Sequence, residues 1–136
     1  MKKLAMLLAL SVTTLGLLTG CGCQKKEKET KKDEIKTNTN ENVIKDQTVD
    51  VFKFEQTSLI YENGNSKLQT TVTNTSDETA YLAEFLIHVK DAEGNEIVTM
   101  TGFVGDSIAA KTSKVIDSTY GEDLTNAASI EYEVVK

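Results

Sequence analysis

Two cysteines near the start of the chain, Cys21 and Cys23, carry its most nucleophilic side chains. A thiolate sulfur attacks electrophilic carbon readily, so either residue could hold a covalent group. No cysteine follows them, and the downstream residues therefore cannot form a disulfide of their own. The sequence predicts chemistry at one of these sulfurs and a domain that depends on its apolar core for stability.

His88 is the only histidine and the only other conventional acid–base group that titrates near neutral pH. It lies in an alternating stretch, on the side away from the apolar residues and near Glu84 and Lys90. A nucleophilic site needs a base and an orienting group together, and no Ser or Cys motif accompanies this residue. We interpret His88 as a surface histidine on a strand and predict no catalytic residue.

The acidic stretch Asp91–Glu96 raises the question of calcium binding. An EF-hand loop needs a glycine at its sixth position and a glutamate six residues later. Gly94 comes too early for this pattern, and the later glutamate is missing. A hairpin turn, in which Asp91 and Asn95 bond to the backbone, explains the stretch better. No zinc ligand set or phosphate loop is present, so we expect no metal and no cofactor.

The residues before the cysteine pair have the pattern of an export signal. Lys2 and Lys3 give a positive start, and an uncharged apolar run extends from Leu4 to Leu18. The run is shorter than the ~20 apolar residues of a membrane-spanning helix, and small residues precede the cysteine. The pattern predicts a signal peptide over residues 1–20. An ordinary signal peptide or an uncleaved anchor, with incidental cysteines, is the alternative.

The residues Leu18, Thr19, Gly20 and Cys21 resemble the lipobox of bacterial lipoproteins: an aliphatic residue, a small residue, Gly or Ala, then Cys. The resemblance implies that the Cys21 sulfur receives a diacylglyceryl group through a thioether. It also implies cleavage by a lipoprotein signal peptidase between Gly20 and Cys21. Cys23 departs from the pattern, because Gly20 stands where its aliphatic residue should be. The implied location is the extracytoplasmic face of the cell membrane, with membrane lipid as partner.

Residues 21–48 are predicted to form a lipidated, disordered tether rich in Lys, Glu and Asn. Over residues 24–48 the apolar side chains are few, and such a segment buries too little surface to offset its ordering entropy. A coil of this length would reach roughly 25–30 Å, and at most about 85 Å when stretched.

From Val49 onward the apolar residues recur with a period of two, which is typical of strands with one buried face. The clearest strand is 81–91, with Tyr81, Ala83, Phe85, Ile87 and Val89 expected on the buried side. Further alternating sets are Leu68, Thr70 and Val72; Val98, Met100, Gly102 and Val104; the stretch 112–120; and Ile130, Tyr132 and Val134.

Turn signals separate these runs. Asn63-Gly64-Asn65 favours a hairpin, because Asn-Gly accepts positive φ angles. The stretches 74–77 and 91–95 favour two more turns, and 123–127 a brief helical turn. The pattern predicts that residues 49–136 form a single all-β, immunoglobulin-like β-sandwich of about seven strands.

The span from about Thr57 to Val135 resembles the FxLYD-type domains and related immunoglobulin-like modules of bacterial lipoproteins. The matching residues are Val72-Thr73-Asn74, then Ile87-His88-Val89-Lys90-Asp91, then Gly94. Ile87, Val89 and Lys90 replace the Phe, Leu and Tyr of the naming motif, and Ala109-Ala110 replaces a Pro-Gly turn. The resemblance implies a fold more than an activity.

Charge narrows the classes of partner. All 15 basic residues are Lys and the net charge is -6, which argues against nucleic-acid binding. We expect a non-enzymatic lipoprotein that presents its β-sandwich for binding a protein at the cell surface or for envelope support. A cation or a basic protein suits residues 49–136, which carry six Lys and fifteen acidic residues. The alternatives are a small-ligand-binding or accessory subunit of a transport system, and an enzyme.

Overall fold

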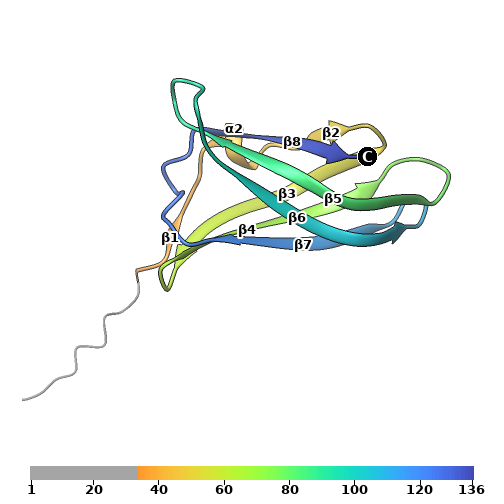
Figure 1. The fold of residues 1–136 in the computed structure, drawn as a ribbon, viewed down its shortest axis with the longest axis horizontal. Coiled ribbons are helices and arrows are strands. Elements are labelled where there is room, and N and C mark those ends of the chain that lie inside the picture. The colour runs from red at the N-terminus through yellow and green to blue at the C-terminus, as the bar shows by residue number, and fades with distance from the viewer. Residues whose placement is uncertain (1–33) are drawn as a thin grey trace, which may run out of the picture. The chain divides into compact units, whose positions relative to one another are not determined.

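Two antiparallel β-sheets pack face to face in the computed structural model, which describes residues 34–136 (Figure 1). One sheet has the order β1–β3–β4–β7, with β2 also paired to β3, and the other has the order β6–β5–β8. The elements are β1 (Lys36–Thr37), α2 (Glu41–Ile44), β2 (Gln47–Val49), β3 (Phe52–Glu62), β4 (Asn65–Asn74), β5 (Ala80–Lys90), β6 (Glu96–Ile108), β7 (Ser113–Tyr120) and β8 (Ser129–Val135).

The predicted all-β sandwich is confirmed, with eight strands in place of about seven. The predicted faces hold for most strands. Leu68, Thr70 and Val72 are buried on β4, and Ile130 and Tyr132 are buried on β8. Alternation predicted these faces correctly because each sheet has one side against the core and one in solvent.

The predicted Asn-Gly hairpin is also confirmed. Asn63 and Gly64 have positive φ angles of 54° and 83° and join β3 to β4, as a two-residue hairpin turn requires. The stretch 123–127, predicted as a brief helical turn, is a single turn closed by the bond from the Ala127 N–H to the Leu124 carbonyl oxygen (3.0 Å).

Three aromatic rings from both sheets form the centre of the core. Phe54 of β3 stacks on Tyr132 of β8, with ring centroids 4.2 Å apart, and its centroid is 4.8 Å from that of Phe85 on β5. The Phe85 ring lies directly over Gly102, its cross-strand neighbour on β6, and occupies the space that a side chain there would need. Gly102 is therefore part of the packing of the core.

Asn74, the last residue of β4, joins two loops to the sandwich. Its side chain is fully buried and donates to the carbonyl oxygens of Glu78 (2.7 Å) and Ile108 (2.8 Å). Its own side-chain oxygen accepts from the backbone N–H (3.0 Å) and the hydroxyl (2.8 Å) of Ser76. All of its side-chain hydrogen-bonding groups are thereby satisfied, which a buried amide requires.

The prediction that Tyr81 is buried is wrong. Its side chain is 66% exposed, whereas its neighbour Leu82 is buried in the core. The register between β5 and β6 shifts between Leu82 and Glu84, where β6 carries an extra residue beside Gly105, whose φ is +62°. Beside this shift the period of two breaks on β5, where Leu82 and Phe85 are both buried, so the alternation that holds from Phe85 to Val89 does not extend to Tyr81.

The prediction of a disordered tether up to residue 48 is wrong for residues 34–48. β1, α2 and β2, which we call the N-terminal strap (residues 34–49), pair with β3 or pack on the sandwich. Val43 is fully buried, and the buried Asn38 side chain donates to the Ala127 carbonyl oxygen (2.9 Å). A few anchoring contacts suffice here, because the other strands supply nearly all of the buried core on which the strap packs. The folded domain therefore includes residues 34–48 as well as the predicted 49–136.

The strap also protects an edge of the second sheet. The side-chain amide of Gln47 donates to the Ile130 carbonyl oxygen (2.8 Å) and lies 3.4 Å from the Tyr132 N–H, from which it accepts. The Gln47 side chain thus bonds to the backbone of β8 in the way that a peptide group of a neighbouring strand would. Exposed strand edges invite pairing with other chains, and this contact covers part of one.

Three predictions lie outside the described residues: the signal peptide (1–20), the lipobox Leu18–Cys21 with its cleavage site at Gly20 and Cys21, and residues 21–33 of the tether. Among residues 34–136, the structure has no helix of the length and apolar character needed to cross a membrane.

Candidate functional site

The outer face of the β6–β5–β8 sheet holds His88, the candidate acid–base residue in the described part of the chain. Phe85, Ile87 and Val89 are buried, so the residues between them on β5 face outward. His88 is among these, as the sequence predicted. The register places Thr99 of β6 and Glu131 of β8 on either side of it.

His88 lies between two carboxylates. Its Nδ1 is 2.8 Å from the Glu96 Oε2, and its Nε2 is 2.9 Å from the Glu133 Oε2. The Thr99 hydroxyl donates to the other oxygen of Glu96 (2.7 Å). Because each ring nitrogen faces an acceptor, the doubly protonated imidazolium fits this site best.

Electrostatics agree with the geometry. The hydrogen bond to Glu133, and next the one to Glu96, raise the pKa of His88, while partial burial opposes them. The Thr99 hydroxyl and then His88 lower the pKa of Glu96. Both carboxylates therefore stabilise the imidazolium form of His88, which links β6 and β8 across β5.

This arrangement suits a cross-strand link better than proton transfer. A general base needs a nitrogen lone pair free to accept a proton, and both nitrogens of His88 donate to carboxylates. The neighbours predicted from sequence, Glu84 and Lys90, are not its partners. Lys90 instead pairs with Glu131 at 2.6 Å, and the partners of His88 come from strands that sequence separation alone could not identify.

The Asp91–Asn95 stretch is the hairpin turn that the sequence favoured over a calcium site. The Asp91 Oδ1 accepts from the backbone N–H groups of Glu93 and Asn95, both at 2.9 Å, and these bonds lower its pKa. The Asn95 side chain donates to the Asp91 carboxylate at 3.3 Å, not to the backbone as expected. Within residues 34–136, no group of three or more His, Cys, Asp or Glu side chains is placed to hold a metal ion.

A second feature of the same face was missed by the sequence analysis. Glu84 of β5 lies between Phe103 of β6 and Val135 of β8 in the register. The Phe103 side chain is 71% exposed, Val135 is 37% exposed, and Tyr81 is exposed on the same strand as Glu84. We call these four residues the aromatic–carboxylate patch. Tyr81 was taken for a core residue, which concealed it.

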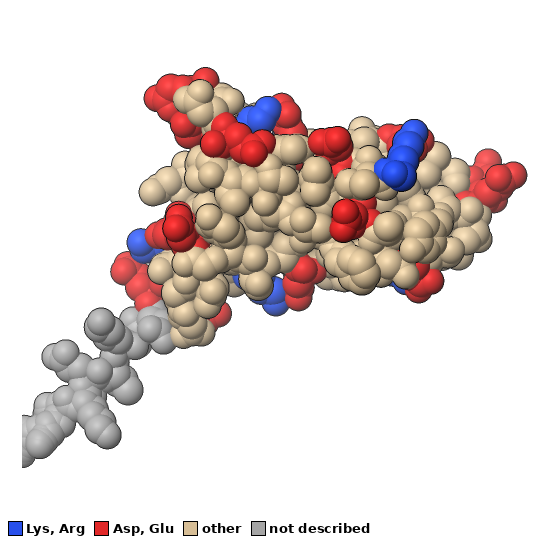
Figure 2. Space-filling view, in the orientation of Figure 1, with Lys and Arg blue, Asp and Glu red and all other residues tan. Residues whose placement is uncertain are grey.

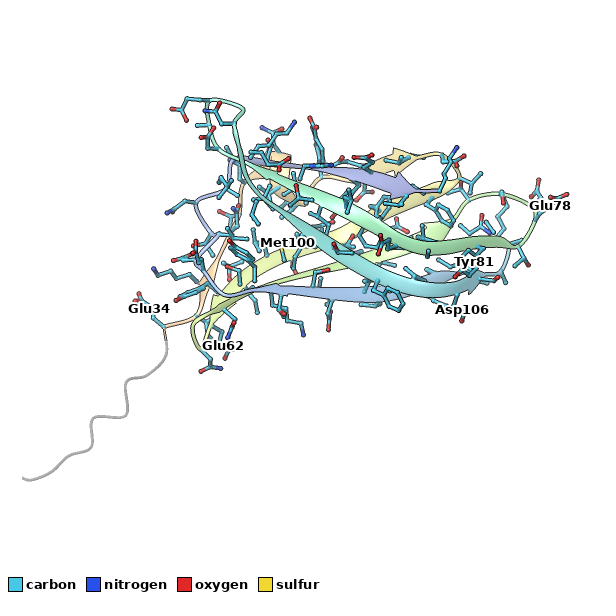
Figure 3. All side chains as sticks on the ribbon, in the orientation of Figure 1. Glu34, Glu62, Glu78, Tyr81, Met100 and Asp106 are labelled. Atoms are coloured by element: carbon cyan, nitrogen blue, oxygen red, sulfur yellow. The ribbon has the colours of Figure 1, made fainter. Side chains whose placement is uncertain are left out.

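The patch lies at the end of the sandwich far from the N-terminal strap's first residue. In Figure 3, Tyr81 and Asp106 are at one end of the molecule, and Glu34 and Glu62 are at the other. Figure 2 shows red acidic side chains over the visible face of the domain and few blue lysines. Residues 34–136 carry eight Lys and eighteen Asp and Glu, a formal net charge of -10.

A hollow on the opposite sheet is small and polar. It has a volume of about 80 Å³ and is lined by Ser58, Ile60, Lys67 and Gln69 of β3 and β4. Pockets that enclose a small molecule usually have about 300–1,000 Å³, so this hollow is too small for such a ligand. His88 does not line it.

No protein family, no curated protein sequence and no solved structure matches this chain. The resemblance to FxLYD-type modules therefore stays a prediction from residues 57–135, as does the immunoglobulin-like relationship. Two of its motif positions have structural roles in the fold: Asn74 is the buried loop anchor, and Gly94, with a φ of +87°, forms the turn between β5 and β6.

Proposed function

We propose that this chain is a bacterial lipoprotein, anchored through Cys21 on the extracytoplasmic face of the membrane, whose β-sandwich is a non-catalytic binding domain. One observation carries the anchoring: a positive start, an uncharged run to Leu18, and Leu18-Thr19-Gly20-Cys21 follow one another in the order that lipidation requires.

The energetics favour a stable anchor. Each buried methylene contributes about 0.8 kcal/mol, and one acyl chain alone binds a membrane only reversibly. A diacylglyceryl group on Cys21 supplies two chains, which hold a protein on the membrane.

Binding is a better proposal for the domain than catalysis. The one histidine has both nitrogens occupied by Glu96 and Glu133, so it lacks a free base. A transport accessory role would call for a ligand pocket, and the hollow beside Lys67 is about 80 Å³. The outer sheet face, with its exposed Phe103 and Tyr81, suits contact with another macromolecule.

Metabolic labelling with a fatty-acid precursor tests the anchor. We expect the wild-type chain to take up label and to sediment with membranes, and Cys21→Ser to lose both properties. Cys23→Ser is the matched control and should remain labelled, since Cys23 is outside the lipobox register. Continued labelling of Cys21→Ser would show that the assignment is wrong.

A further inference from the structure

Several carboxylates lie on the outer face of the β6–β5–β8 sheet. Among them, within the described residues, Glu84 alone forms no ion pair with a lysine or histidine. On this face, Glu96 and Glu133 are 2.8 and 2.9 Å from His88. Glu131 is 2.6 Å from Lys90. Glu84 is half-buried and has no ion pair or side-chain hydrogen bond in residues 34–136. A half-buried carboxylate loses part of its hydration and gains most from a cation that arrives from outside.

The neighbours of Glu84 are apolar and exposed. Phe103 and Val135 are its cross-strand partners on either side, and Phe103 is 71% exposed. Tyr81 also faces outward, because Ala80 and Leu82 on either side of it pack against the core. Exposed apolar side chains gathered on one sheet face of a soluble domain are typical of interaction surfaces.

The Phe103 ring lies over the backbone of Gly105. Two of its ring carbons lie only 2.8 and 2.9 Å from the position that a Cβ on Gly105 would occupy, so the ring rests against the glycine backbone. Gly105 has a φ of +62° in the β6 bulge.

From these observations we propose that the aromatic–carboxylate patch docks an arginine or lysine side chain of a partner protein. The Glu84 carboxylate would bind the cationic group, while the ring faces of Phe103 and Tyr81 would contact the alkyl stem or the guanidinium plane. The net charge of -10 on residues 34–136 favours the approach of a cationic segment and disfavours an anionic surface. The inference rests on the proposed binding function and names the chemistry of its partner.

Nuclear magnetic resonance titration of residues 34–136, which contain the whole described core, tests the proposal. The probe is the capped peptide acetyl-(Gly-Arg)₃-amide at low salt. We expect saturable shifts of the backbone amide signals around residues 81–84 and 103–105. Glu84→Gln and Phe103→Ser should each weaken the apparent affinity about threefold or more, as expected for a partly exposed charge pair and a cation–π contact.

Two matched variants separate a site from diffuse attraction. Glu93→Gln removes the same charge from the exposed β5–β6 turn, and Val115→Ser removes a 60% exposed apolar side chain from the other sheet. Both should bind the peptide as the wild type does. If Glu93→Gln weakens binding as much as Glu84→Gln, the attraction is diffuse and the proposal is wrong.

Two further results would overturn the proposal. Equal binding of acetyl-(Gly-Gln)₃-amide would show that the patch has no preference for a cation. Concentration-dependent shifts of the same amides without peptide would assign the patch to a second copy of this chain. Neither result affects the labelling test of Cys21, so the anchored binding domain and this inference can fail separately.

Discussion

Replacement of Asn74 by alanine should destabilise the domain more than most single substitutions. The change removes two donated hydrogen bonds, to Glu78 and Ile108, and two bonds accepted from Ser76. Each contributes about 1 kcal/mol net, and a buried acceptor left without a donor costs about 1–3 kcal/mol. Since water can reach the exposed Glu78 and the half-buried Ser76, we expect a loss of about 3 kcal/mol in the free energy of unfolding.

Asn74→Asp gives the same prediction a pH-dependent form. A carboxylate can still accept from Ser76, but it cannot donate to the two carbonyl oxygens that the amide now contacts. Those oxygens should raise the pKa of the new carboxyl group above its unfolded value of about 3.9. The destabilisation is then complete above the folded pKa, decreases as the pH falls from the folded to the unfolded pKa, and is smallest below the unfolded pKa, where the neutral acid can donate.

Urea unfolding of residues 34–136, followed by far-ultraviolet circular dichroism, measures both effects. Asn65→Ala is the matched control: Asn65 is exposed and donates one 3.2 Å bond to the Asn63 carbonyl oxygen, so its loss should cost less than about 0.5 kcal/mol. A cost below about 1 kcal/mol for Asn74→Ala at pH 7 would refute the argument that this buried amide holds the two loops.

Three further changes test other parts of the structure. The His88 link should stabilise the fold fully below the unfolded pKa of histidine, about 6.5, and this stabilisation should be lost as the pH rises through the raised folded pKa. His88→Gln should remove this pH dependence from the free energy of unfolding measured at pH 5.5 and 8.5. Gly102→Ala forces a methyl group into the Phe85 ring and should lower the unfolding free energy by about 2 kcal/mol in urea titrations. Val43→Ala should cost about 1.5 kcal/mol and speed amide hydrogen exchange in the N-terminal strap.

Each of these changes has a control or a contradicting result. Gly121→Ala adds a methyl group where no atom lies within 4 Å and should leave stability nearly unchanged. Ile44→Ala, at a position that is 38% exposed beside Val43, should have a smaller effect than Val43→Ala. An imidazole pKa at or below 6.5, measured by nuclear magnetic resonance, would contradict the His88 link.

Local patterning predicted those parts of the fold that depend on neighbouring residues alone. Leu68, Thr70 and Val72 keep the period of two within β4, although the register with β3 shifts opposite Thr70, between Glu55 and Ser58. Tyr81 was misplaced because the alternation on β5 breaks between Leu82 and Phe85, which are both buried, beside the register shift with β6. Alternation within one strand carries no information about a bulge in its partner.

The candidate site was also predictable only in the part that one strand's own sequence determines. The outward direction of His88 was predictable from β5, but Glu133 lies 45 residues away in sequence and becomes its partner only through strand pairing. The strap was misjudged because composition was weighed for the segment alone. Residues 34–48 have too few apolar residues to fold by themselves, yet Val43 and Asn38 use surface that the rest of the domain already provides.

The early start of the folded domain changes how closely it would be confined near the membrane. If Cys21 is the anchor, the stretch 24–48 that was expected to link it to the domain shortens to 24–33. Its greatest extension falls from about 85 Å to about 35 Å. The effective concentration of the domain toward a membrane-bound partner falls roughly as the −3/2 power of the linker length, so it rises about fourfold. A weak site could therefore be well occupied by a neighbour on the same membrane, while partners farther from the bilayer would lie beyond its radius.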